Sequence, residues 1–79
     1  MNDVEARVRS VVVKVAKLDE KRAQFSPDAD LFRELGVEST AALDLLLSLE
    51  EEFAISIPDA KFGDARTLTA LTQLVSELA

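Results

Sequence analysis

The chain has 79 residues, enough for one small domain and too few for a multidomain enzyme. It contains no histidine and no cysteine, so the usual general base, the thiol nucleophile and the commonest metal ligands are missing. Fifteen acidic and nine basic residues give a net charge of −6, which disfavours binding to nucleic acid. We therefore expect a single domain over residues 1–79 that is not an enzyme, has no catalytic residues and binds no metal.

The charges are unevenly distributed along the chain. Residues 1–27 carry six basic and four acidic side chains, whereas residues 28–79 carry three basic and eleven acidic ones. The acidic part is expected either to meet a basic partner or only to keep a small protein soluble. No apolar run approaches the roughly 20 residues that span a membrane, and residues 1–10 lack the layout of a signal peptide. We expect a soluble, cytoplasmic monomer.

The first predicted helix begins at Asn2, a favourable N-cap residue, with Glu5 three residues later as in a capping box. Apolar residues then recur every three or four positions, which is typical of one face of a helix. These residues are Val4, Val8, Val11, Val12, Val15 and Leu18. The helix is expected to end near Leu18–Asp19.

Residues 20–38 are predicted to form a long, ordered connection. The pair Ser26-Pro27 favours a short turn, because proline suits the first position after a cap. Gly36 is expected to close the segment with a positive φ, a conformation that glycine adopts without strain. Four apolar side chains are the candidate anchors into the core: Phe25, Leu31, Phe32 and Leu35.

The clearest predicted helix covers residues 39–53, with Ser39 as its N-cap. One face carries the residues expected in the core, which are Ala42, Leu45, Leu46, Leu49 and Phe53. Leu43 and Leu47 lie toward the opposite face. The acids that flank them are Asp44, Glu50 and Glu51. This apolar strip edged by carboxylates predicts either a docking surface or a solvated helix whose outer leucines meet the long connection.

The remaining residues predict an extended stretch and two more helices. Pro58 stops a helix from passing through residues 55–58, and Asp59 is expected to cap a short helix over residues 59–63 that Gly63 ends. Thr67 is expected to cap the last helix. Its apolar residues are Leu68, Leu71, Leu74, Val75 and Leu78. The predicted fold class is therefore all-α: an antiparallel four-helix bundle of three longer helices and a short third one, with a long first loop.

Three segments carry a resemblance to a known family: residues 30–39 (DLFRELGVES), 49–53 (LEEEF) and 55–59 (ISIPD). In this order and spacing they resemble the acyl carrier proteins, in which a serine of an Asp-Ser-Leu motif opens the second helix and carries a 4′-phosphopantetheine arm. The matching serine is Ser39. The departures from the family pattern are Glu38 for aspartate, Thr40 for leucine or isoleucine, and Ala41 where an acid is common.

A serine at the start of a helix suits this role physically. Backbone N–H groups and the helix dipole favour a negatively charged phosphodiester at that end. The resemblance implies that a separate transferase activates the hydroxyl of Ser39 and takes the arm from coenzyme A, so no local histidine is needed. The alternative is that Ser39 is only the helix cap, because serine is among the preferred cap residues.

The resemblance implies a free-standing acyl carrier protein that holds an acyl, aminoacyl or polyketide cargo as a thioester, in fatty acid, polyketide or another specialised biosynthesis. Its implied partners are a phosphopantetheinyl transferase and the enzymes that load, transfer or condense the cargo, each with a basic docking patch. The implied docking residues are Glu38, Thr40, Leu43, Asp44, Leu47, Glu50 and Glu51. The alternative is a carrier-like acidic adaptor that carries no arm, which Thr40 motivates.

Overall fold

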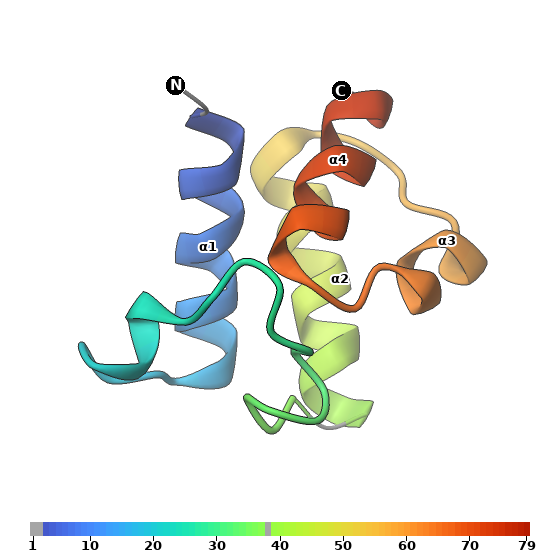
Figure 1. Cartoon of the computed structure of the whole chain (residues 1–79). Coiled ribbons are helices and arrows are strands. Elements are labelled where there is room, and N and C mark those ends of the chain that lie inside the picture. The colour runs from blue at the N-terminus through green and yellow to red at the C-terminus, as the bar shows by residue number, and fades with distance from the viewer. Residues whose placement is uncertain (1–2, 38) are drawn as a thin grey trace.

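The computed structural model describes residues 3–37 and 39–79, and of Ser39 it describes the backbone alone. The regular structure of these residues consists of four α-helices and one 3₁₀-helix (Figure 1). They are α1 (Asp3–Ala16), η1 (Arg22–Gln24), α2 (Ser39–Phe53), α3 (Asp59–Asp64) and α4 (Leu68–Leu78). The all-α fold class predicted from the sequence is confirmed. The predicted cap at Asn2 lies outside the described residues.

The three longer helices pack with α1 next to both α2 and α4. In Figure 1, α1 runs downward whereas α2 and α4 run upward, so α1 is antiparallel to both of its neighbours. One hydrophobic cluster joins these helices to the first loop, and its fully buried members are Val8, Val12, Leu31, Leu45, Leu49, Leu68, Leu71 and Val75. The valine-rich α1 depends on this packing, because valine has only modest helix propensity.

Helix α1 ends at Ala16, slightly before the predicted boundary. Lys17 has a φ of 54°, and the N–H groups of Lys17 and Leu18 donate to the carbonyl oxygens of Lys14 (3.4 Å) and Val13 (3.0 Å). This is a Schellman end, in which a left-handed residue turns the chain away from the helix. Glycine usually occupies that position, so the lysine gave no sequence signal for it. Leu18 is buried just beyond this turn, as predicted.

The connection after α1 is ordered, as predicted. Arg9 holds it against α1 by donating from Nη1 to the carbonyl oxygens of Ala23 (2.9 Å) and Phe25 (2.8 Å). The Arg9 guanidinium also lies 4.3 Å from the centroid of the Phe25 ring. The predicted turn at Ser26-Pro27 forms, with Ser26 Oγ accepting a backbone N–H at 3.2 Å. Of the predicted anchors, Phe25, Leu31 and Leu35 are buried, and Phe32 is partly buried.

Helix α2 has the bounds that were predicted, Ser39–Phe53. Its inner face is confirmed as part of the core by the burial of Leu45, Leu46 and Leu49. Ala42 and Phe53, which were also expected in the core, are only partly buried. Phe53 ends the helix at the protein surface, where the guanidinium of Arg7 covers its ring at 4.4 Å. Phe53 therefore lies at the margin of the core and not at its centre.

The chain leaves α2 through a second left-handed residue. Ala54 has a φ of 55°, and the N–H of Ile55 donates to the carbonyl oxygen of Glu50 at 3.2 Å. The carboxylate of Glu50 accepts the N–H of Ile57 at 2.8 Å. Ile57 is buried, so the predicted extended stretch packs onto the core. Glu50 thus holds this stretch through both its backbone and its side chain.

Helix α3 (Asp59–Asp64) differs in detail from the prediction. Pro58 is its N-cap residue, and Asp59 is the first helical residue and not the cap. Gly63 lies inside the helix, and Ala65 is the C-cap. Gly63 does not have a positive φ, so the chain does not use the left-handed freedom that makes glycine a helix end.

Helix α4 begins after Thr67, and the predicted cap is confirmed. Thr67 Oγ1 accepts the N–H of Ala70 at 3.1 Å, which satisfies a backbone donor of the first turn. The predicted apolar face is buried at Leu68, Leu71, Leu74 and Val75, and Leu78 is partly buried. The first loop crosses the start of this helix, where the Thr69 N–H donates to the Pro27 carbonyl at 3.2 Å.

Candidate functional site

The start of α2 is the centre of the candidate site. Ser39 is the first residue of the helix, and the first-turn N–H groups of a helix lack partners within it. Gly36 has a φ of 70°, which confirms the predicted left-handed conformation. Leu35 and Val37 beside it are buried and anchor the chain as it approaches the helix. Ser39 is the first helical residue of α2, the position that Asp59 has in α3, and not the residue before the helix, where its predicted role as N-cap would place it. Glu38 and the side chain of Ser39 lie outside the described residues.

A tight turn at residues 30–34 precedes this approach. Asp30 Oδ1 accepts the N–H groups of Phe32 and Arg33, both at 2.9 Å. The carboxylate of Glu34 accepts the N–H of Asp30 at 2.8 Å. These reciprocal bonds are similar to those of a capping box, but the returning carboxylate is four positions after Asp30 and not three. The turn is therefore closed by its own side chains.

Leu31 connects this turn to two other parts of the molecule. Its N–H donates to the carbonyl oxygen of Arg66 at 2.8 Å, in the junction between α3 and α4. Its own carbonyl oxygen accepts the N–H of Val37 at 3.2 Å. Val37 is two positions before Ser39, so a short chain of backbone hydrogen bonds links the α3–α4 junction to the approach to α2.

The side chain of Arg66 strengthens the same connection. Its Nε lies 2.9 Å from Asp30 Oδ2, and its guanidinium lies 4.8 Å from the centroid of the Phe32 ring. We call Arg66, Asp30 and Phe32 the loop clamp. The Arg66 hydrogen bond, helped by the Arg33 N–H, holds the pKa of Asp30 below its usual range. A lowered folded-state pKa means that this pair stabilises the fold above the ordinary carboxyl range, and that the contribution disappears as the pH falls through the folded-state pKa.

The outer face of α2 carries large apolar side chains in contact with solvent. Leu43 is 58% exposed and Leu47 is 48% exposed. Thr40, Asp44 and Glu51 are exposed as well, and their helical spacing places all five residues on one side of α2. We call these five residues the outer face. The helix as a whole contains four acidic residues and no basic one. The exposure predicted for the outer face is confirmed, whereas its docking role stays a prediction.

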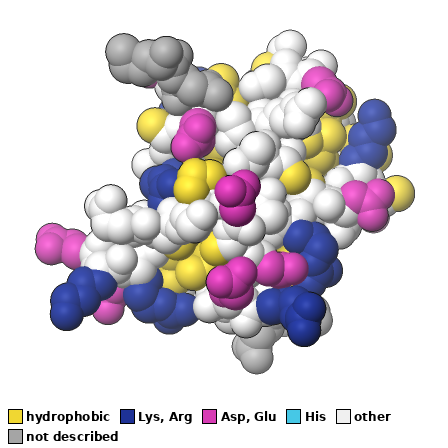
Figure 2. Space-filling view, viewed as in Figure 1, with side chains coloured by type: hydrophobic (Ala, Val, Ile, Leu, Met, Phe, Trp, Pro, Cys, Tyr) yellow, Lys and Arg dark blue, Asp and Glu magenta, His cyan; other side chains and the backbone are white. Residues whose placement is uncertain are grey.

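The face of the molecule that is drawn in Figure 2 has a different charge pattern. Figure 2 shows that acidic and basic side chains are interspersed on the face that includes α1, α4 and the first loop.

Glu50, predicted to belong to the docking surface, is partly buried at the edge of the outer face. Its carboxylate accepts the Ile57 N–H, so this acid serves the fold.

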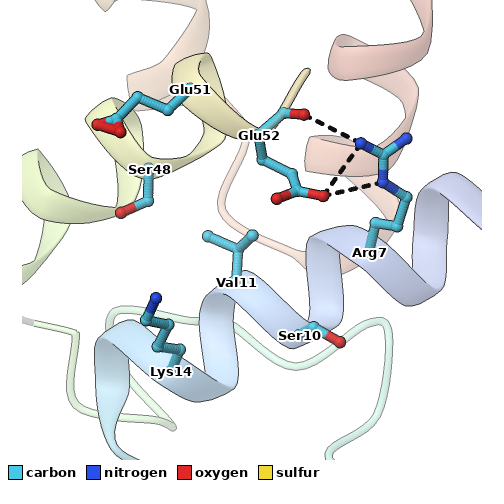
Figure 3. A pocket seen from close by; sticks show the side chains of 7 residues that line it. All are labelled: Arg7, Ser10, Val11, Lys14, Ser48, Glu51 and Glu52. Atoms are coloured by element: carbon cyan, nitrogen blue, oxygen red, sulfur yellow. Dashed lines mark hydrogen bonds and ion pairs between the residues drawn. The ribbon is translucent and has the colours of Figure 1, made fainter. Parts of the chain in front are cut away.

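A groove of about 550 Å³ runs between α1 and α2, beside the outer face (Figure 3). At one end Arg7 Nε donates to Glu52 Oε2 and Arg7 Nη2 donates to the Glu52 carbonyl oxygen, both at 3.0 Å. The residues that line the groove are Arg7, Ser10, Val11, Lys14, Ser48, Glu51 and Glu52. Charged and hydroxyl groups on both walls make the groove unsuitable for an apolar acyl chain.

Comparison with known protein families matches residues 6–75 to the family described as phosphopantetheine attachment site. The match covers most of the chain, including all of α2 and the loop clamp. The chain belongs to this family of phosphopantetheine-binding carrier proteins. The resemblance to acyl carrier proteins seen in the sequence is confirmed by this match.

Membership of the carrier family fixes the general biochemistry. The protein is a carrier and not an enzyme, and its cofactor is 4′-phosphopantetheine in covalent attachment. Carrier proteins interact with enzymes that modify them and with biosynthetic enzymes. Within residues 3–37 and 39–79, no helix has the length and apolar character needed to span a membrane.

The contacts between arginine side chains and phenylalanine rings were not predicted from the sequence. Within residues 3–37 and 39–79, three arginine guanidinium groups each lie over a phenylalanine ring, at 4.4, 4.3 and 4.8 Å from the ring centroid. The pairs are Arg7 with Phe53, Arg9 with Phe25, and Arg66 with Phe32. Such contacts join residues far apart in the chain, so no local spacing predicts them.

Proposed function

We propose that Ser39 carries the 4′-phosphopantetheine arm and that the protein presents a thioester-bound cargo to partner enzymes of a specialised biosynthetic pathway. The observation that carries this proposal is the position of Ser39 as the first residue of α2, within the matched residues 6–75. The first turn of α2 contains no acidic residue. A phosphodiester on Ser39 would therefore meet unpaired N–H groups and the positive end of the helix dipole, with no like charge in that turn.

The attachment reaction needs no catalytic group from the carrier. The serine oxygen forms a bond to the phosphorus next to the pantetheine of coenzyme A, and the phosphoanhydride bond to the adenosine bisphosphate portion breaks. The transferase supplies the base that takes the serine proton. The carrier supplies an ordered approach to the helix, built from Gly36 and the buried Leu35 and Val37.

We propose that partner enzymes dock on the outer face of α2. Leu43 and Leu47 offer apolar contact, and Asp44 and Glu51 offer charges that attract arginines or lysines of a basic patch. Glu38 is a further candidate acid beside the serine. The cargo proposed is an acyl, aminoacyl or polyketide-like chain. The polar Thr40 is exposed one position after the serine, which favours partners adapted to this carrier over general fatty acid enzymes.

The second hypothesis from the sequence is an acidic adaptor without an arm. The family match favours the carrier over the adaptor, because the matched family is defined by the attachment of phosphopantetheine. The adaptor makes the opposite prediction about chemical modification, so one experiment separates the two.

The experiment is intact mass measurement after incubation with coenzyme A, magnesium and a broad-specificity phosphopantetheinyl transferase. The wild-type protein is expected to gain one phosphopantetheine, and Ser39→Ala none. Ser56→Ala is the matched control, because Ser56 is an exposed serine outside the helices and should leave modification intact. An unmodified wild type would favour the adaptor, and a modified Ser39→Ala would move the arm to another residue.

A further inference from the structure

A second cluster, near the C-terminal end of α2, has the same kinds of side chain as the loop clamp. Each consists of an arginine, a carboxylate and a phenylalanine ring: Arg66 with Asp30 and Phe32, and Arg7 with Glu52 and Phe53. The arginine–carboxylate distances are 2.9 and 3.0 Å, and the distances from guanidinium to ring centroid are 4.8 and 4.4 Å. The two arginine side chains are also similarly exposed, at 47% and 49%.

The two clusters connect different parts of the molecule. Arg7 joins α1 to Glu52 near the C-terminal end of α2 (Figure 3). Ser39 is at the opposite end of that helix. The loop clamp instead joins the α3–α4 junction to the turn at residues 30–34, which leads into α2. Arg66 uses its side chain on Asp30 and its carbonyl oxygen on the Leu31 N–H. Leu31 in turn holds Val37, two residues before Ser39.

We propose that Arg66 is a positioning residue for attachment of the arm. Acting through Asp30 and Leu31, it fixes residues 30–37 and thereby the orientation in which the start of α2 presents its serine to the transferase. The inference rests on the proposed attachment at Ser39. Transfer requires the serine oxygen to approach the phosphorus of coenzyme A in line with the bond that breaks, and small misplacements of reacting groups lower rates steeply.

The charge and the shape of Arg66 can be tested separately. Arg66→Gln removes both the charge and the guanidinium fork, whereas Arg66→Lys keeps the charge without the fork. With the same transferase and coenzyme A, kcat for Arg66→Gln is expected to fall about tenfold, below the hundredfold that a 1 Å displacement can cost. The KM should stay within about twofold, because the docking face of α2 is unchanged. Arg66→Lys should recover part of the rate.

Arg7→Gln is the matched control, since it breaks an equivalent cluster that does not hold the approach to α2. It should lower the melting temperature about as much as Arg66→Gln and leave kcat for modification unchanged, with all variants assayed well below their melting temperatures.

If Arg66→Gln does not fold, Asp30→Asn replaces it. Asparagine keeps an oxygen for the N–H groups of Phe32 and Arg33 but removes the charge that faces Arg66, and kcat should fall about threefold.

Equal kcat values for Arg66→Gln and Arg7→Gln would overturn the inference and leave the loop clamp as a purely stabilising contact. The same holds if Arg66→Gln changes only KM. These failures are separate from failure of the attachment proposal. Modification of Ser39→Ala would refute attachment at Ser39, whereas wild-type rates of Ser39 modification in Arg66→Gln would refute the positioning role alone.

Discussion

The leucines of α2 occupy two opposite faces of one helix and have opposite surroundings. Leu45 and Leu49 are 1% and 0% exposed and pack in the core, whereas Leu43 and Leu47 are 58% and 48% exposed. An exposed apolar pair contributes little to folding, and we propose that this pair, rimmed by acids, forms part of an interaction surface. The inner face of α2 therefore serves stability, and the outer face is free to serve partner recognition. The following predictions test that division.

The largest effect on the fold is expected from Leu49→Ala. This change empties a fully buried position and should lower the free energy of unfolding by about 3–5 kcal/mol. That is a large share of the stability of a small domain. Urea denaturation followed by circular dichroism measures it. A loss below about 1 kcal/mol would contradict the assignment of the inner face to the core.

The same substitution on the outer face, Leu47→Ala, should act on binding instead. Because Leu47 is half exposed, the free energy of unfolding should change by less than about 0.5 kcal/mol. The KM for the transferase should rise at least about threefold, since apolar contact with the partner is lost. Steady-state kinetics and urea denaturation on one preparation give both values. An unchanged KM combined with a clear loss of stability would reverse the proposed roles.

The neighbouring acids Glu50 and Glu51 offer a finer test of the same division. Glu50→Ala leaves the Ile57 N–H without its partner and should lower the free energy of unfolding by about 1 kcal/mol.

Glu51→Lys should leave the free energy of unfolding nearly unchanged. It should slow association with a basic partner, most strongly at low salt. Stopped-flow association at several salt concentrations checks the second effect. A salt-independent rate for both wild type and Glu51→Lys would argue against electrostatic docking.

The smallest expected effect is a gain of stability at the end of α2. Ala54 has a φ of 55°, which glycine adopts more readily than alanine, so Ala54→Gly should raise the unfolding free energy by about 0.5–1 kcal/mol. Ala6→Gly, at an exposed position near the start of α1, is the control and should lower it by up to about 1 kcal/mol. Neither change touches the outer face, so transferase kinetics should stay constant. Thermal denaturation gives the sign of each effect.

Local signals in the sequence predicted much of this fold. The spacing of leucines and valines located the inner face of α2, Thr67 marked the start of α4, and Gly36 marked the left-handed turn before the site. Each of these features depends on residues within a few positions of one another. The same reasoning placed the exposed Leu43 and Leu47 correctly.

Features that depend on distant residues or on unusual conformations were missed. Lys17 and Ala54 end helices in a conformation that their side chains disfavour, so their identities gave no signal. Glu50 looked like a surface acid because its partner is a backbone N–H seven positions away. The loop clamp joins Asp30 to Arg66, which are 36 positions apart, and only the packed structure brings them together.

The most direct test of the whole account is to locate the arm on the unaltered protein. After modification by the transferase, cleavage after Arg33 and Lys61 releases one peptide that contains Ser39 together with the competing hydroxyls of Thr40, Ser48 and Ser56. Fragment-ion mass spectrometry of that peptide should place a single phosphopantetheine on Ser39. An arm on Thr40, Ser48 or Ser56, or a peptide without any arm, would contradict the central claim.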